Sequence, residues 1–141
     1  MTRAGTAIDA LSRRNPDALR LAKAVSFAVI VDRALLRAAR IAFVPEADAG
    51  AEADLWFSNV VKSRTVDGIV FDREVAEDLR SRMSEEEVER AWALIQKEHD
   101  WLAPSLKIEE EIAYLSVSRT PDAREKLTRR LQSVVRAMLR G

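Results

Sequence analysis

The segment AEADLWFSNVVKSRTVDGIVFD, residues 51–72, is the one stretch of the chain without a clean helical repeat. It carries an aromatic pair, Trp56 and Phe57, and a turn signal at Asp67-Gly68. The stretches before and after it have the apolar spacing of amphipathic helices. The fold is therefore expected to be organised around this irregular segment.

Within this segment we expect three pieces. Residues 51–61 are predicted to form a short helix, and residues 62–68 a loop that contains the turn. Residues 69–71, Ile-Val-Phe, are β-prone. Because three residues are too few to make a sheet alone, we expect them to be an extended piece of core.

The flanking helices are marked by residues that favour helix starts. Asn15-Pro16-Asp17 combines an N-cap, a proline at the first helical position and an acidic residue in the first turn. Other expected N-caps are Asp32, Asp72, Ser84 (with Glu87 completing a capping box), Ser105 and Thr120. The predicted helices cover residues 16–31, 33–43, 51–61, 73–83, 85–102, 106–117 and 121–139. One continuous helix over residues 16–43 is the alternative, since no glycine or proline forces a break at Asp32.

These elements predict an all-α fold, a compact bundle of about six to seven short-to-medium helices with short connections. We expect residues 1–14 to be a flexible lead-in and residues 15–141 to form a single helical domain. The last helix has apolar residues at helical spacing, so we expect them to form a buried face and Leu131→Asp to unfold the domain. That expected face consists of Leu127, Leu131, Val134, Val135, Met138 and Leu139.

Composition narrows the class of protein. The chain has 141 residues, of which 48% are hydrophobic and 33% are charged, and it has no cysteine. It is too apolar for a disordered chain, and it can form neither disulfides nor thiolate metal sites. No apolar run approaches the roughly 20 residues that span a bilayer, and we expect a cytoplasmic protein.

Charge is segregated along the chain although the formal net charge is zero. Residues 1–40 carry a net charge of +5, residues 41–118 of −10, and residues 119–141 of +5. One interpretation is charge complementarity inside a folded domain. The other is a two-signed surface that selects partners or neighbouring copies.

The sequence contains few residues that could carry out catalysis or bind a metal. The single histidine, His99, falls on the core side of a helix and is interpreted as a packed or hydrogen-bonded structural residue. The acidic runs at residues 85–87 and 109–111 are interpreted as solvated helix starts. No Gly-rich phosphate loop or nucleophile elbow is present. We expect no catalytic residues, no cofactor and no metal, and hence a protein that is not an enzyme.

Two arginine stripes define the alternative function, a nucleic-acid-binding helical domain. One consists of Arg33, Arg37 and Arg40, and the other lies on the last helix with Arg124, Arg129, Arg130, Arg136 and Arg140. Arginine stripes can contact phosphates, but the acidic middle of the chain would repel a duplex. A nucleic-acid binder should join the two stripes into one continuous basic face, whereas an interaction module should leave Trp56 or a neighbouring apolar patch exposed.

Candidate partner-binding residues follow from these features. Aromatic residues and arginines are favoured anchors of protein interfaces, and loops carry function readily. The candidates are Trp56, Arg64, Asp67, Arg129 and Arg130.

Residues 35–118 also resemble a helical module of multidomain bacterial conflict (defence) systems. The resemblance is carried by AEADLWFS (51–58), by Ser63, Arg64, Asp67, Gly68 and Val70, and by EEEIAYLSVS (109–118). That module accompanies NTPase, caspase-like or trypsin-like protease, or formylglycine-generating-enzyme-like domains. The resemblance implies an adaptor or effector-associated domain that links a regulator to an effector. The expected partner is a protein domain in cis or in trans, or a second copy in a homo-oligomer, rather than nucleic acid or a membrane.

Overall fold

The computed structural model describes residues 2–140; Met1 and Gly141, the ends of the expected lead-in and domain, lie outside them. These residues are mostly helical, with 67% in eight helices, and they include one small two-stranded sheet. The all-α expectation is therefore correct for the bulk of the fold and wrong for the sheet. The helices are α1 (Arg3–Arg14), α2 (Pro16–Ala24), α3 (Arg33–Phe43), α4 (Ala49–Trp56), α5 (Arg73–Ser81), α6 (Glu85–Glu98), α7 (Pro104–Leu115) and α8 (Ala123–Arg140), and the strands are β1 (Val61–Thr65) and β2 (Gly68–Phe71).

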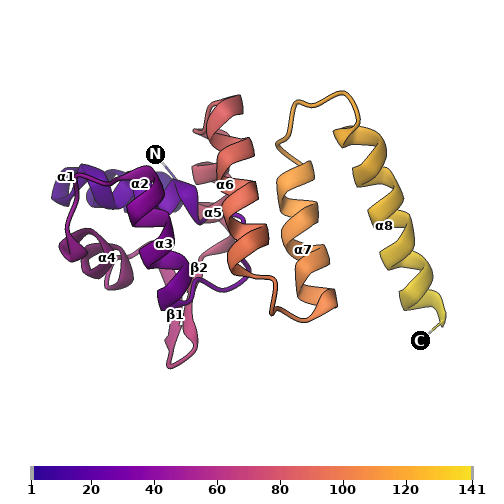
Figure 1. Cartoon of the computed structure of the whole chain (residues 1–141), viewed down its shortest axis with the longest axis horizontal. Helices are drawn as coiled ribbons and strands as arrows, with labels where there is room; N and C mark the ends of the chain where they lie inside the picture. The colour runs from indigo at the N-terminus through magenta and orange to yellow at the C-terminus, as the bar shows by residue number, and fades with distance from the viewer. Residues whose placement is uncertain (1, 141) are drawn as a thin grey trace.

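Helix α2 lies at the centre of the body. It contacts α1, α3, α4, α5 and α6, and its Ala18, Leu21 and Ala22 are fully buried. Small alanines let the surrounding helices approach closely while Leu21 fills the space between them. Helices α6, α7 and α8 follow one another side by side toward the opposite end of the molecule (Figure 1).

The predicted helix over residues 16–31 is too long. Helix α2 ends at Ala24, and the apolar run after it is not helical. Val31 instead pairs with Ile69 through two backbone hydrogen bonds, of 2.8 and 3.0 Å. The β-branched residues of this run disfavour a helix, and the pairing satisfies the backbone groups of Val31 in the core. Asp32 then caps α3, as predicted.

Residues 61–71 form a β-hairpin. The expectation of a loop over residues 62–68 followed by an extended piece of core over residues 69–71 is therefore wrong. The two strands pair antiparallel, with Arg64 opposite Ile69 and Thr65 opposite Gly68. The turn is centred one residue earlier than predicted, on Val66 and Asp67. The hairpin projects from the body, with its tip at the edge of the molecule (Figure 1).

Residues 3–14, expected to belong to a flexible lead-in, form helix α1. Thr2 caps it by accepting a hydrogen bond from the Gly5 amide. Ala4, Ile8 and Leu11 lie on one face at helical spacing and are buried. The sequence shows the same spacing, and burial of this apolar face against α2 and α5 stabilises the helix.

Most predicted helix starts are confirmed. Asn15, Asp32 and Asp72 accept hydrogen bonds from the first-turn amides of their helices, and Ser84 and Glu87 form the capping box. Ser105 and Thr120 are the exceptions. Helix α7 begins with Pro104 at its first position and has no side-chain cap, and α8 begins at Ala123, three residues after Thr120.

Helix α8 does not have the buried face that its periodicity predicted. Within residues 2–140, α7 is the element against which α8 chiefly packs, and Ala123 is its one buried residue. Leu131, Val135, Met138 and Leu139 are exposed. The expectation that they form core is wrong, because an apolar stripe does not specify which element covers it.

Gly68 is the one described residue at positive φ, at 152°, and its Cα lies against Val31. A Cβ there would stand 2.5 Å from the Val31 carbonyl oxygen, a backbone atom that cannot move alone. We expect Gly68→Ala to destabilise the fold by about 1–3 kcal/mol. Urea unfolding should show this loss, whereas Val66→Ala, at the 96% exposed neighbouring turn position, should change little. Equal stability of Gly68→Ala and the unmodified chain would contradict the close approach.

Leu131→Asp should leave the fold intact, contrary to the expectation from periodicity, because the side chain is 46% exposed. Leu79→Asp is the matched comparison, since Leu79 is fully buried on α5. Placing an unpaired charge there should cost several kcal/mol and unfold the domain. Circular dichroism and thermal melts of both variants test the contrast, and unfolding of Leu131→Asp would show that α8 is part of the core.

Candidate partner-binding site

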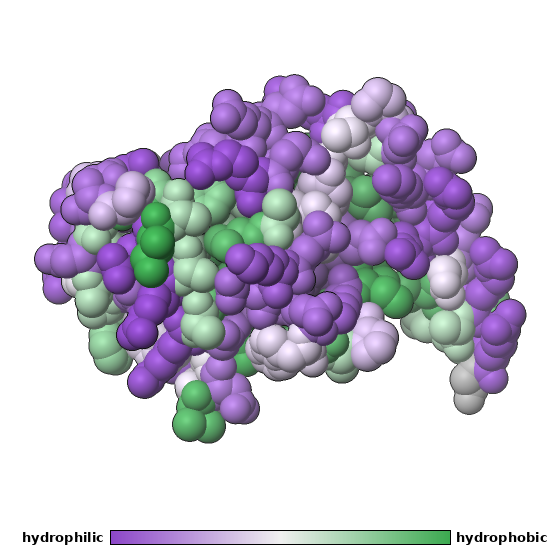
Figure 2. Space-filling model, in the orientation of Figure 1, coloured by the Kyte–Doolittle hydropathy of each residue, from purple (hydrophilic) through white to green (hydrophobic). Residues whose placement is uncertain are grey.

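An open apolar groove runs between α3 and α4 and encloses about 700 Å³. Its apolar lining includes Leu36, Ile41, Ala53, Trp56 and Phe57. Ile41 is 59% exposed and Phe57 is 74% exposed. Apolar surface is visible among hydrophilic side chains at this end of the molecule in the space-filling view (Figure 2). Exposed large apolar residues that gather in one concave place are typical of a binding site.

Two arginines stand on the α3 wall of the groove. Arg33 lies over the Trp56 ring, with its guanidinium carbon 5.4 Å from the ring centroid. Arg33 and Arg37 are one helical turn apart and exposed, and neither has a carboxylate of residues 2–140 within ion-pair distance. Arg40 differs, because its Nε lies 2.5 Å from Glu52 and its Nη1 donates to the Ala47 carbonyl. The groove therefore presents two available cations beside an apolar floor.

Arg64 caps the C-terminal end of α4. Its guanidinium donates to the carbonyl oxygens of Trp56, at 2.7 Å, and Ser58, at 2.9 Å, and lies 6.0 Å from the Phe57 ring centroid. A cation that binds the last carbonyls of a helix complements its dipole. Arg64, which lies on strand β1 of the hairpin, thus fixes the end of α4 and the adjacent Phe57.

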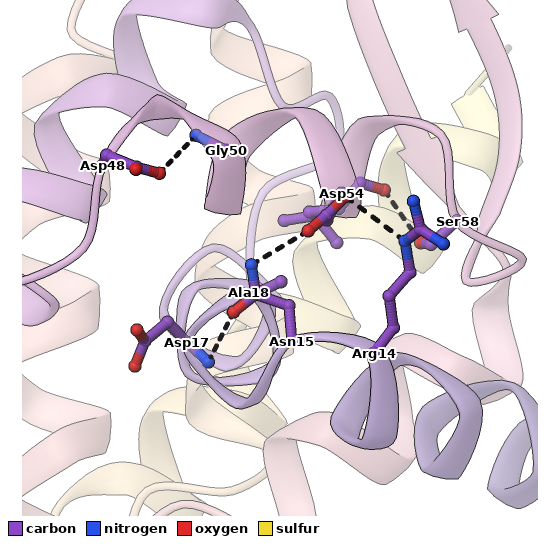
Figure 3. A network of polar contacts seen from close by, with 9 residues as sticks. Arg14, Asn15, Asp17, Ala18, Asp48, Gly50, Asp54 and Ser58 are labelled. Carbon is purple, nitrogen blue, oxygen red and sulfur yellow. Dashed lines mark hydrogen bonds and ion pairs between the residues drawn. The ribbon is translucent and has the colours of Figure 1, made fainter.

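Asp54 joins α4 to the junction between α1 and α2 (Figure 3). Its carboxylate accepts hydrogen bonds from Asn15 Nδ2, at 2.9 Å, and from Arg14 Nε, at 3.3 Å. The pKa of Asp54 is lowered chiefly by the Asn15 hydrogen bond, with Arg14 adding to it. Asn15 also caps α2, so one residue joins the start of the central helix to the groove wall.

The structure brings together only some of the candidate residues. Trp56 lines the groove, and Arg64 donates to its carbonyl oxygen from β1 without lining the groove itself. Asp67 lies at the exposed turn of the hairpin, and Arg129 and Arg130 lie on α8 at the opposite end of the molecule (Figure 1). Arg130 is bound bidentately by Glu111, at 2.8 and 3.0 Å.

Ile41 was missed as a site residue. A signal for it was present in the sequence, because Ile41 is an apolar residue off the stripe formed by Leu35, Leu36 and Ala39, all of which are buried. Arg33 and Arg37 were recognised as part of a basic stripe, but not as neighbours of Trp56.

A second polar cluster, centred on His99, lies in the interior. Its Nδ1 lies 2.7 Å from Glu110 Oε2 and its Nε2 lies 2.8 Å from Asp32 Oδ1. When both carboxylates are ionised they can only accept, so each ring nitrogen then donates a proton and the ring is an imidazolium. Burial alone would lower the pKa of His99, but the hydrogen bonds and charges of Glu110 and Asp32 together raise it. The prediction of a hydrogen-bonded structural histidine is confirmed.

Residues 109–111 are expected from the sequence to lie on a solvated face, but Glu110 does not. It is 2% exposed, and the same oxygen that binds His99 accepts the Val29 amide at 3.0 Å. Helix α7 begins at Pro104, so residues 109–111 lie beyond its first turn, and Glu110 faces the body while Glu109 stays exposed. Near it, Tyr114 stacks on Trp92 with ring centroids 4.8 Å apart, so polar and aromatic contacts together fix α7 to the body.

Searches against protein-family models, curated proteins and solved structures gave no match to the chain. The resemblance to a conflict-system module therefore remains a prediction. Among residues 2–140 no group of three or more His, Cys, Asp or Glu side chains is placed to hold a metal ion. No helix in the same range has the length and apolar character needed to cross a bilayer.

The raised pKa of His99 predicts how stability depends on pH. An unfolded histidine titrates near pH 6.5, so the imidazolium contribution is fully present below that pH and is lost as the pH rises through the higher folded pKa. Thermal melts should therefore fall in midpoint above pH 6.5. His99 is the only histidine, so its NMR titration is unambiguous, and a measured pKa below 6.5 would contradict the assignment.

Glu110→Gln and Glu109→Gln form a matched pair for the same network. Glu110→Gln removes the buried charge that faces the imidazolium, and it should lower both the pKa of His99 and the stability, the latter by about 3 kcal/mol. Glu109→Gln, one residue away and exposed, should change neither quantity measurably. Equal effects of the two substitutions would rule out the network as an anchor of α7.

Proposed function

We propose that this chain is a non-catalytic protein-interaction domain whose α3–α4 groove binds an apolar segment of a partner. The observation that carries the proposal is the exposure of Ile41 and Phe57 on one concave apolar surface, beside Arg33 and Arg37, which form no ion pair within residues 2–140. Following the resemblance, the partner is an effector or regulator domain of a bacterial signalling or defence system. The domain would act as the adaptor between them.

The groove has the features of a site for a helix or an extended apolar peptide. Its two walls are helices, so a third amphipathic segment can lie between them with apolar side chains against Leu36, Ile41 and Phe57. Arg33 and Arg37 can each bind a carboxylate of that segment. Apolar burial would provide most of the affinity, and the arginines would select partners with acidic residues at the matching positions.

The alternative, a nucleic-acid-binding domain, lacks the continuous basic face that it requires. Helices α3 and α8, which carry these arginines, lie on opposite sides of α6 and α7 (Figure 1). In addition, Arg40 and Arg130 are engaged by Glu52 and Glu111.

Selection of a displayed random-peptide library on the purified protein tests the groove. We expect enriched peptides to combine apolar residues with Asp or Glu, and Ile41→Asp to weaken their binding at least about tenfold. Val66→Asp is the matched control, because it places the same charge at an exposed apolar position on the hairpin turn, away from the groove. Peptides that bind both variants equally, or selection without enrichment, would refute the groove as the site.

A further inference from the structure

Helix α8 has a half-covered apolar surface. On the α7 side, Ala123 is buried, Leu127 is partly buried, and Arg130 is fixed by Glu111. On the open side lie Leu131, Val135, Met138 and Leu139, which we call the α8 stripe; Met138 and Leu139 are 75% and 83% exposed. These four residues recur at the spacing of one helix face, and nothing else in residues 2–140 covers them.

The charges around the α8 stripe are almost all positive. Within α8, six basic residues accompany one acidic residue, Glu125, which lies 3.9 Å from Arg129. Arg124 stands seven residues before Leu131, so it extends the line of the stripe toward the start of the helix. Arg136 and Arg140 accompany its C-terminal half. None of these three arginines has an ion-pair partner among the described residues.

We propose that the α8 stripe is a second docking surface, and that its occupant is an amphipathic helix of a partner protein with Asp or Glu beside its apolar residues. Such a helix would cover Leu131, Val135, Met138 and Leu139 and place carboxylates near Arg124, Arg136 and Arg140. Helix-on-helix packing with complementary flanking charges is a common way for proteins to select a partner.

Charge argues against two other occupants. A second copy paired through α8 would place a stripe flanked by arginines against an identical one, and antiparallel pairing would bring Arg124 toward Arg140. An anionic lipid surface is much wider than one helix, so it would also approach α7, which lies beside α8 and carries the exposed Glu109. An acidic helix avoids both repulsions.

This surface is independent of the α3–α4 groove. The two lie at opposite ends of the long axis of the molecule, with α6 and α7 between them (Figure 1). Both can therefore be occupied at once, which gives a single small domain the two contacts that an adaptor needs. Failure of either surface in its own test leaves the other unaffected.

The test is a selection from a library of helical peptides about 18 residues long, the length of α8. The apolar positions are fixed at helical spacing, and the flanking positions vary among Asp, Glu, Ser, Lys and Arg. We expect Asp and Glu to be enriched, and binding of the enriched peptides to weaken as salt increases. Met138→Asp should weaken this binding at least about tenfold, and Leu139→Asp should do the same, while Phe57→Asp in the groove should not.

Several results would overturn the proposal. They are selection without enrichment, enrichment of neutral or basic flanks, and peptide binding that Met138→Asp and Leu139→Asp leave unchanged in folded protein. Light scattering that shows a dimer lost in Met138→Asp would assign the stripe to a second copy. Sedimentation with phosphatidylserine vesicles that is lost in the same variant would assign it to lipid.

Discussion

The placement of the C-terminal helices depends on one buried histidine held between two carboxylates. His99, at the end of α6, lies between Asp32, which caps α3, and Glu110, in the middle of α7. Each carboxylate also accepts a backbone amide, from Leu35 and from Val29. Because a buried charge without a partner is costly, these segments have to meet in one geometry. The placement of α7, and through it that of α8, follows from this contact together with the aromatic stack on Trp92.

Helix α7 consequently divides the molecule into two unlike parts. On one side is a body with a continuous core around α2, in which the Val31–Ile69 pairing closes the sheet against the helices. On the other side, α8 rests on a single neighbour. The apolar surface of the body is concave and that of α8 is convex, yet each is bordered by arginines that have no ion-pair partner within residues 2–140. The chain thus presents two apolar surfaces with arginines at their borders, and α6 and α7 lie between them (Figure 1).

Much of the fold could be predicted from local sequence signals, and the misses have a common cause. Caps such as Asn15, Asp72 and Ser84 act within one helical turn, so they are readable without knowledge of the rest of the chain. The β-hairpin and the extended run that ends at Val31 depend on pairing between residues far apart in the sequence. Glu110 could not be distinguished from its neighbours in the run Glu109-Glu110-Glu111, because its partner is 11 residues away. For the candidate site, Trp56 and Arg64 were predictable by residue type, but the apolar face of α8 was assigned to the core because periodicity does not show what covers a face.

The burial of the only histidine affects how the protein surface responds to pH. Histidine is the one side chain whose ordinary pKa places its titration between pH 5 and 8. With His99 1% exposed, the surface described here holds no side chain of that kind. The electrostatic field around the two proposed docking surfaces should therefore change little between pH 5 and 8. A rise in pH can still affect them indirectly, by deprotonating the His99 ring that holds α7 in place.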